Sequence, residues 1–168
     1  MSETLETSRT RTITWEDPSS IAKLGQTMSG LEYLRTMQEG KVPPPPIALL
    51  FGMWIEEVSE GHVVFAAEPA EYHYNPIGTV HGGLAATLLD SALGCAIHSK
   101  LPAGTGYTTL QLNINYLRPI TDKTGVIYCA GNVIHVGGRV ATAEGRLTDE
   151  DGKLYAHATT TCIILKPM

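Results

Sequence analysis

The sequence predicts an α+β fold in which an antiparallel sheet of five or six strands curls around one long helix. Residues 84–100 are apolar on nearly every side, and such a helix must be enclosed. No second strand–helix–strand unit appears, so an antiparallel sheet is expected. The apolar-rich runs that predict strands are 47–58, 62–68, 107–117, 126–135, 139–148 and 153–165.

Within 107–117 the side chains alternate, with Leu110, Leu112, Ile114 and Tyr116 on one face. The first two runs flank Ser59-Glu60-Gly61, which predicts a hairpin.

Composition excludes several classes of protein. A chain of 168 residues predicts one domain, and its net charge of -5 without a Lys/Arg cluster argues against nucleic acid as a partner. Cys95, Cys129 and Cys162 are odd in number and far apart, which indicates reduced thiols and no disulfide framework. The first 20 residues lack the apolar core of a signal peptide, and the apolar helix is too short to span a bilayer. We therefore expect a cytoplasmic protein without a membrane partner.

The first 46 residues predict an N-terminal extension, followed by the main domain at 47–168. Residues 1–17 are expected to be poorly ordered, with a possible short strand at 11–15. Apolar residues spaced by three and four predict one amphipathic helix from Ser19 or Ser20 to Met37, with Gly40 as a stop. Residues 43–46 are all proline and predict a stiff spacer. The extension is expected to cover the domain or a neighbouring subunit; a lid over a ligand entrance is the alternative.

The central helix combines two features of an acyl-transfer site. Asp90 is the only charge between His81 and His98, and an enclosed carboxylate is costly unless it is paired, protonated or used. Gly82 and Gly83 open the helix, where free N–H groups can bind a developing oxyanion. Because Gly82 and Asp90 are about 12 Å apart along the helix axis, they can act together only if two copies of the chain pair.

Other catalytic motifs are missing from the sequence. The Gly104-Thr105-Gly106 run lacks a third glycine and precedes a strand, so it is not a dinucleotide loop. The six histidines show no metal-ligand spacing, and we expect neither a metal nor a cofactor. Taken singly, Asn75 could be a turn former, His81 a structural histidine and Asp90 the partner of an arginine.

Two motifs carry a family resemblance. They are Asn75-x-x-Gly78-Thr79-x-His81-Gly82-Gly83 with an aspartate nine residues after the histidine, and Asn113-x-Asn115-Tyr116-Leu117-Arg118-Pro119. Together they resemble the hotdog-fold acyl-CoA thioesterases of the phenylacetate-degradation (PaaI-like) type. The segments at 138–144 and 156–162 are similar too, so that the resemblance runs from about residue 47 to 165.

The resemblance implies a role for each motif residue. Asp90 would act as general base on water or as nucleophile, and the Gly82 N–H of a partner subunit would polarise the thioester carbonyl. Asn75 and His81 would lie beside that carbonyl. The implied assembly is a homodimer with one continuous sheet, usually paired again into a tetramer.

A serine or threonine on the strand after the helix would help to hold the water or the carboxylate. Thr109 falls there, with Thr108 as the alternative. Strict alternation puts Thr109 on the face opposite Leu110, so its use requires an irregular strand start or a different wall of the site. Candidates to meet the CoA phosphates are Arg118, Lys123 and Arg139.

Hydrolysis of acyl-CoA thioesters is therefore the leading hypothesis. Two alternatives remain: a non-catalytic hotdog module that binds acyl-CoA and regulates a partner, and a hotdog hydratase or dehydratase. The acyl group cannot be read from the sequence.

Overall fold

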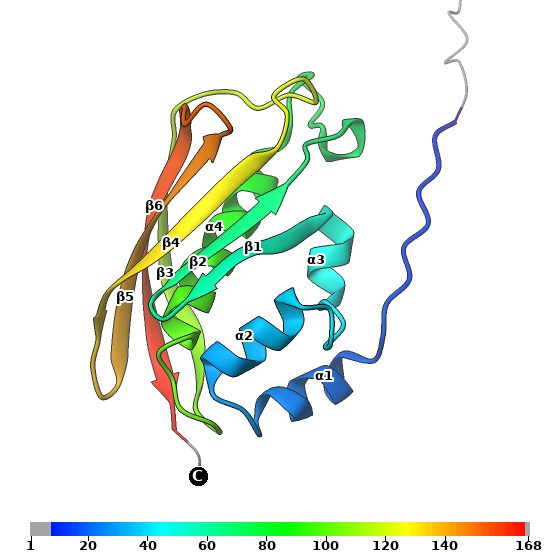
Figure 1. The fold of residues 1–168 in the computed structure, drawn as a ribbon. Coiled ribbons are helices and arrows are strands. Elements are labelled where there is room, and N and C mark those ends of the chain that lie inside the picture. The colour runs from blue at the N-terminus through cyan, green and yellow to red at the C-terminus, as the bar shows by residue number, and fades with distance from the viewer. Residues whose placement is uncertain (1–7, 167–168) are drawn as a thin grey trace, which may run out of the picture.

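A six-stranded antiparallel sheet packed around one helix forms the body of the protein (Figure 1). The computed structural model describes residues 8–166. The strands are β1 (Met53–Ser59), β2 (His62–Ala67), β3 (Gly106–Tyr116), β4 (Ile127–Val136), β5 (Val140–Asp149) and β6 (Leu154–Leu165). Their order in the sheet is β1-β2-β4-β5-β6-β3, which leaves β1 and β3 as edge strands. The predicted α+β architecture is confirmed.

The central helix, α4 (Gly82–His98), packs against five of the six strands, β2 to β6. Its large side chains Leu88, Leu89 and Leu93 are fully buried, as the apolar sequence requires. The helix begins two residues earlier than predicted, because His81 caps it and both glycines adopt helical geometry. It also ends two residues earlier, with Ser99 as its C-cap.

Two glycines at the centre of the sheet let α4 approach closely. Gly131 on β4 pairs with Gly145 on β5. A Cβ on Gly131 would lie 2.4 Å from the Ala92 carbonyl oxygen, and one on Gly145 would lie 2.3 Å from Leu93 Cδ1. The helix backbone around Ala92 therefore rests directly on the sheet.

The segment before the sheet differs from the prediction. The β1–β2 hairpin is present, but its first strand begins at Met53 because residues 46–51 form a short helix, α3 (Pro46–Phe51). Pro46 stands at the first helical position, where proline is favoured, and Gly52 ends the helix with a positive φ of 62°. The predicted strand from Ile47 is therefore wrong over its first half.

The predicted single amphipathic helix is also wrong: it is divided into α1 (Pro18–Gly25) and α2 (Gly30–Gln38). Ser29 and Glu32 form a capping box that starts α2 as a new helix. Gly30 follows, and a Cβ there would lie 1.8 Å from the His98 carbonyl oxygen, so α2 contacts the end of α4. Figure 1 shows α1, α2 and α3 together on the β1 side of the body. We call these three helices the roof helices.

Residues 8–17 form no helix or strand, so the possible strand at 11–15 is wrong. Arg11 explains their path: its guanidinium donates to the carbonyl oxygens of Leu49 (2.9 Å) and Leu50 (2.7 Å) in α3 and lies over the ring of Tyr72. Polar side-chain contacts thus replace strand pairing. The expectation for residues 1–7 lies outside the described residues. Between β2 and α4 the chain forms a 3₁₀ turn, η1 (Glu71–His73), and the loop 74–80.

Candidate active site

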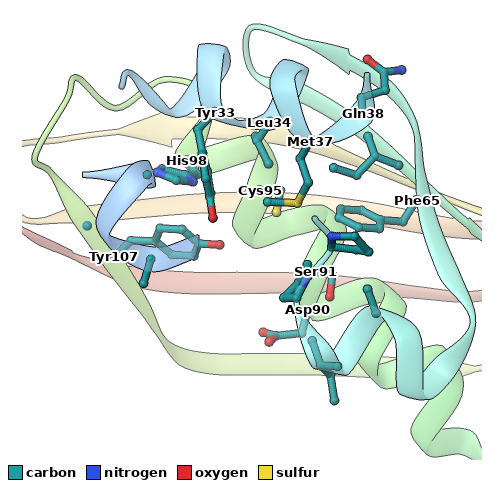
Figure 2. Close-up of a pocket in the computed structure, with 18 of the residues that line it drawn as sticks. Tyr33, Leu34, Met37, Gln38, Phe65, Asp90, Ser91, Cys95, His98 and Tyr107 are labelled. Carbon is teal, nitrogen blue, oxygen red and sulfur yellow. The ribbon is translucent and has the colours of Figure 1, made fainter. Parts of the chain in front are cut away.

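A cavity of about 1350 Å³ lies between α4 and the roof helices, and Asp90 lines it (Figure 2). One wall comes from α4 and the first residues of β3, and the roof helices form the opposite wall with apolar side chains such as Leu34 and Met37. Met53, Ile55 and Phe65 of the β1–β2 hairpin close one side. The result is a largely apolar chamber with one carboxylate in its wall.

Asp90 is held by Thr109, whose Oγ1 donates a hydrogen bond of 2.9 Å to Oδ1. No hydrogen bond to Oδ2 occurs among residues 8–166, which leaves that oxygen available to a ligand. The sequence led us to expect an enclosed carboxylate. This expectation is wrong for the single chain, because Asp90 is exposed towards the cavity.

An irregular start of β3 brings Thr109 to this position. The β3–β6 pairing shifts register between Thr109 and Gln111, so that Leu110 is an extra residue and is 61% exposed. The predicted face containing Leu110 is therefore wrong at that residue. The bulge turns Thr109 towards α4 while Leu112 and Ile114 still pack against the core.

The start of α4 presents one free backbone donor. His81 Nδ1 accepts a hydrogen bond of 2.8 Å from the Gly83 N–H and so caps the helix. The Gly82 N–H donates no hydrogen bond within the part of the chain that the structure describes, while the Gly82 carbonyl accepts one from the Tyr116 hydroxyl at 3.3 Å. Of the two glycines, only Gly82 is left to bind a ligand oxygen through its N–H.

Asn75 organises the loop that leads to this terminus. Its Oδ1 accepts from the N–H groups of Ile77 (3.0 Å) and Thr79 (3.3 Å), and its Nδ2 donates to the Thr79 hydroxyl. This is the turn-forming role that base rates favour, and it fixes the approach of the chain to His81.

Comparison with known proteins identifies the family. The thioesterase superfamily model matches residues 77–156. The chain is 31% identical to the solved structure of a phenylacetic acid degradation-related protein from Ralstonia eutropha JMP134, with a TM-score of 0.70. The match covers 78% of this chain and 98% of that one. The chain belongs to the thioesterase superfamily.

Curated relatives agree with this assignment. The chain is 37% identical over 91 residues to a candidate esterase of Halobacterium salinarum, covering 51% of this chain and 58% of the relative. It is 26% identical over 115 residues to a 1,4-dihydroxy-2-naphthoyl-CoA hydrolase of Listeria monocytogenes, covering 68% and 92%. The predicted hotdog-fold resemblance is confirmed, and the protein stands among the thioester hydrolases.

The thioesterase match includes α4, Asp90 and Thr109 but excludes the roof helices.

The other residues predicted to bind the substrate are dispersed. Thr108 lines the cavity next to Thr109. Arg118, which donates to the Leu154 carbonyl oxygen, and Arg139 lie beside opposite ends of β6, roughly 30 Å apart at the usual strand rise. Lys123 is exposed in the loop after Arg118. One chain therefore does not gather these three cations into a single phosphate site.

Sequence reasoning missed a stripe of half-buried side chains on α4. Ser91, Cys95 and His98 recur at the spacing of one helix face and line the cavity beyond Asp90. Tyr107 and Tyr33 complete this end, with ring centroids 5.4 Å and 6.0 Å from that of His98. The spacing i, i+4, i+7 of less apolar residues was the signal that could have identified this face.

The titratable groups at this end of the cavity are neutral near pH 7. Burial raises the pKa of the Cys95 thiol to about 12 and raises the pKa of the Tyr107 phenol well above its usual value. Burial lowers the pKa of His98, which favours the neutral imidazole.

Among residues 8–166 no group of three or more His, Cys, Asp or Glu is placed to hold a metal ion. No helix in the same range is long and apolar enough to cross a membrane.

Proposed function

We propose that the protein hydrolyses acyl-CoA thioesters, with Asp90 as general base on water or as nucleophile. One observation carries the proposal: a carboxylate with one oxygen fixed by Thr109 and the other unbonded faces a large apolar cavity. Thioester hydrolysis needs an activated water or a carboxylate nucleophile and a donor for the developing oxyanion. A thiolate leaves readily, so the absence of a strong general acid near Asp90 is compatible with this reaction.

The Gly82 N–H is the proposed oxyanion donor, and it comes from a second subunit. Within one helix it stands about 12 Å from Asp90 along the axis, too far for both groups to reach one carbonyl. The two contacts are also far apart on β3, because Thr109 contacts Asp90 and Tyr116, seven residues later, contacts Gly82. If two β3 edges pair antiparallel around residues 112–113, the Tyr116 end of one chain lies opposite the Thr109 end of the other. That pairing would bring Gly82 of one subunit to Asp90 of its partner.

The free edge of β3 supports such a dimer. This strand is 11 residues long and ends the sheet, so its outer backbone groups pair with no strand among the described residues. An open edge of this length is a template for another strand. We propose a homodimer with one continuous sheet, which a second dimer can join to form a tetramer.

The acyl group is proposed to lie in the cavity beneath the roof helices. The Listeria relative is named as the hydrolase of a bicyclic aromatic acyl-CoA, and the cavity here has the volume and apolar lining for a large acyl group. Residues 1–46 then act as an extension that covers the substrate, while residues 47–168 form the hydrolase domain. The CoA phosphates are assigned to Arg118 and Lys123, with Arg139 from another part of the assembly.

The proposal predicts that two inactive variants restore each other. Asp90→Asn removes the base at nearly constant shape and should lower turnover by about 10² or more. Gly82→Pro removes the N–H at the first helical position, where proline is tolerated, and should cost about 10²–10³-fold. Turnover is measured as free thiol released from a panel of acyl-CoAs.

Gly82→Ala is the matched control, because it brings the same Cβ within 3.3 Å of the Tyr116 ring but keeps the N–H. Denaturing, mixing and refolding the two inactive chains equally should give about half mixed dimers, and so intact sites at roughly a quarter of the total. Background activity in demonstrated mixed dimers would exclude the shared site. Wild-type turnover in folded Asp90→Asn would exclude the proposed catalytic role.

A further inference from the structure

The Thr109 hydroxyl can serve Asp90 only while its single hydrogen points at the carboxylate. A free threonine hydroxyl rotates and can donate to other acceptors nearby. Cys162 of β6 is the cross-strand neighbour of Thr109, and its Sγ lies 3.9 Å from Thr109 Oγ1. Cys162 is wholly buried, with an exposed fraction of 0%.

The direction of this contact follows from counting hydrogens. Thr109 already donates its one hydrogen to Asp90, so in the contact with Cys162 its oxygen must accept. Thr160 also lies 3.9 Å from Cys162 Sγ, and it donates its hydrogen to the Gln111 carbonyl oxygen at 2.9 Å. Burial raises the pKa of the Cys162 thiol, which therefore keeps its proton, and its one hydrogen can be given to only one of the two hydroxyl oxygens at a time.

Thr160 also stabilises the bulge that turns Thr109 inward. Gln111 is the first residue after the extra Leu110, and its carbonyl is the acceptor that Thr160 binds. A bulge removes regular ladder pairing, so a buried side chain that bonds its backbone stabilises the irregular conformation. Cys162 thus orients the hydroxyl and Thr160 fixes the backbone that carries it.

We infer that Cys162 and Thr160 are positioning residues, which act through Thr109 to aim the Asp90 carboxylate at the thioester. This inference rests on the proposed function, since it assigns them a part in setting up the same base. Neither residue contacts substrate. Their effect should appear in kcat and not in substrate affinity.

Asp90 is well suited to report such an effect, because its other ionisable neighbours are neutral. Cys95, Tyr107 and Cys162 interact with it, and each keeps its proton near pH 7. No ion pair to Asp90 occurs among residues 8–166. The hydrogen bond from Thr109 is therefore the main contact that fixes the carboxylate, and loosening it should let the carboxylate leave the position in which it faces the thioester.

The test is a double-mutant cycle of Cys162→Ala and Thr109→Ala in the full chain. Cys162→Ala should lower kcat about three- to tenfold at unchanged KM. In the Thr109→Ala background the same substitution should change neither quantity, because the group through which it acts is gone. Cys162→Ser keeps a donor and should recover most of the loss.

Cys129→Ala supplies the matched control. Cys129 is equally buried, on β4, and its substitution leaves a comparable cavity without touching Thr109. It should lower thermal stability as Cys162→Ala does but leave kcat unchanged. Equal losses of kcat in the two alanine variants, or independent effects in the cycle, would overturn the inference.

A second readout separates this inference from the proposed function. The carboxyl ¹³C chemical shift of Asp90 can be recorded at pH 7 in the free protein without any substrate. A displaced signal in Cys162→Ala, but not in Cys129→Ala, supports the inference even if acyl-CoA is not the substrate. An undisplaced signal contradicts it even if wild-type protein hydrolyses acyl-CoA.

Discussion

The two walls of the cavity are built in different ways. The wall of α4 and β3 carries Asp90, fixed by a hydrogen bond from Thr109 and backed by buried strands. The roof wall presents apolar side chains such as Leu34 and Met37. The first lies within the segment that matches the thioesterase superfamily, and the second lies before it. The proposed function therefore assigns the chemistry and the choice of acyl group to separate segments of the chain.

This difference predicts large catalytic effects on the first wall. Thr109→Ala should lower kcat about ten- to a hundredfold, which is the size expected for a hydrogen bond to a charged group. The ratio of kcat/KM between long and short acyl-CoAs should not change, because Thr109 lies on the wall that carries Asp90 and not on the roof wall. Steady-state kinetics on an acyl-CoA series measure both quantities. A changed chain-length preference with normal kcat would contradict the division between the walls.

The roof wall should respond in the opposite manner. Met37→Ala removes about three heavy atoms facing the cavity, so acyl groups longer by one or two methylenes should gain about fourfold in kcat/KM per added methylene. Turnover of short acyl groups should stay within about twofold. Arg35→Ala is the matched control, because Arg35 lies exposed on α2 and does not line the cavity. If both variants keep the wild-type preference, the acyl group does not lie beneath α2.

The smallest effect concerns the attachment of the roof helices. His73 is buried; its Nδ1 accepts from the Ala70 N–H at 3.0 Å, and its Nε2 lies 3.1 Å from the Phe51 carbonyl oxygen at the end of α3. Burial, followed by the nearby Arg11 charge, lowers the pKa of His73, although the bond to Phe51 acts in the other direction. The folded protein therefore resists protonation at His73, while the unfolded chain accepts a proton below about pH 6.5.

Stability should consequently be complete above that pH and should fall as the pH drops towards the lower, folded value. Between pH 7.5 and 5.5 we expect the Tm of wild type to fall about 3 °C more than that of His73→Gln. His98, whose pKa burial also lowers, is present in both proteins and cancels in the difference. Equal slopes of Tm against pH in wild type and His73→Gln would show that His73 does not cause the loss of stability at low pH.

The sequence predicted the body of the protein better than its roof. Apolar runs and turn residues placed the strands because each run is long and its period is unambiguous. The short helix α3 begins at the last of four consecutive prolines and is apolar throughout, so its composition is equally compatible with a strand. The break between α1 and α2 was readable, since Ser29-x-x-Glu32 is a capping-box motif. That the roof helices fold over Asp90 depends on tertiary packing, which no local pattern records.

The candidate site divides in the same way. Asp90, Thr109 and the start of α4 were predicted, and the structure brings Thr109 to Asp90. For Thr109 the sequence allowed either an irregular start of the strand or a different wall of the site. It could not decide between them, because the alternation of side chains does not show where a bulge interrupts a strand. That Gly82 and not Gly83 keeps a free N–H depends on the rotamer of His81. Cys162 lies 72 positions from Asp90 in the sequence, and only the pairing of β3 with β6 brings it to Thr109.

The paired glycines beneath α4 have a consequence for how variants of this protein should be interpreted. Gly131 faces the backbone of Ala92, two residues from Asp90, and a side chain there would have to push the helix away from the sheet. Even a displacement of a few tenths of an ångström would be transmitted to the carboxylate, while Thr109 would stay with β3. A screen for lost activity would then select Gly131 together with the cavity residues, although nothing that binds there could reach it. The distance between α4 and the sheet at Gly131 therefore determines how Asp90 is aligned with Thr109.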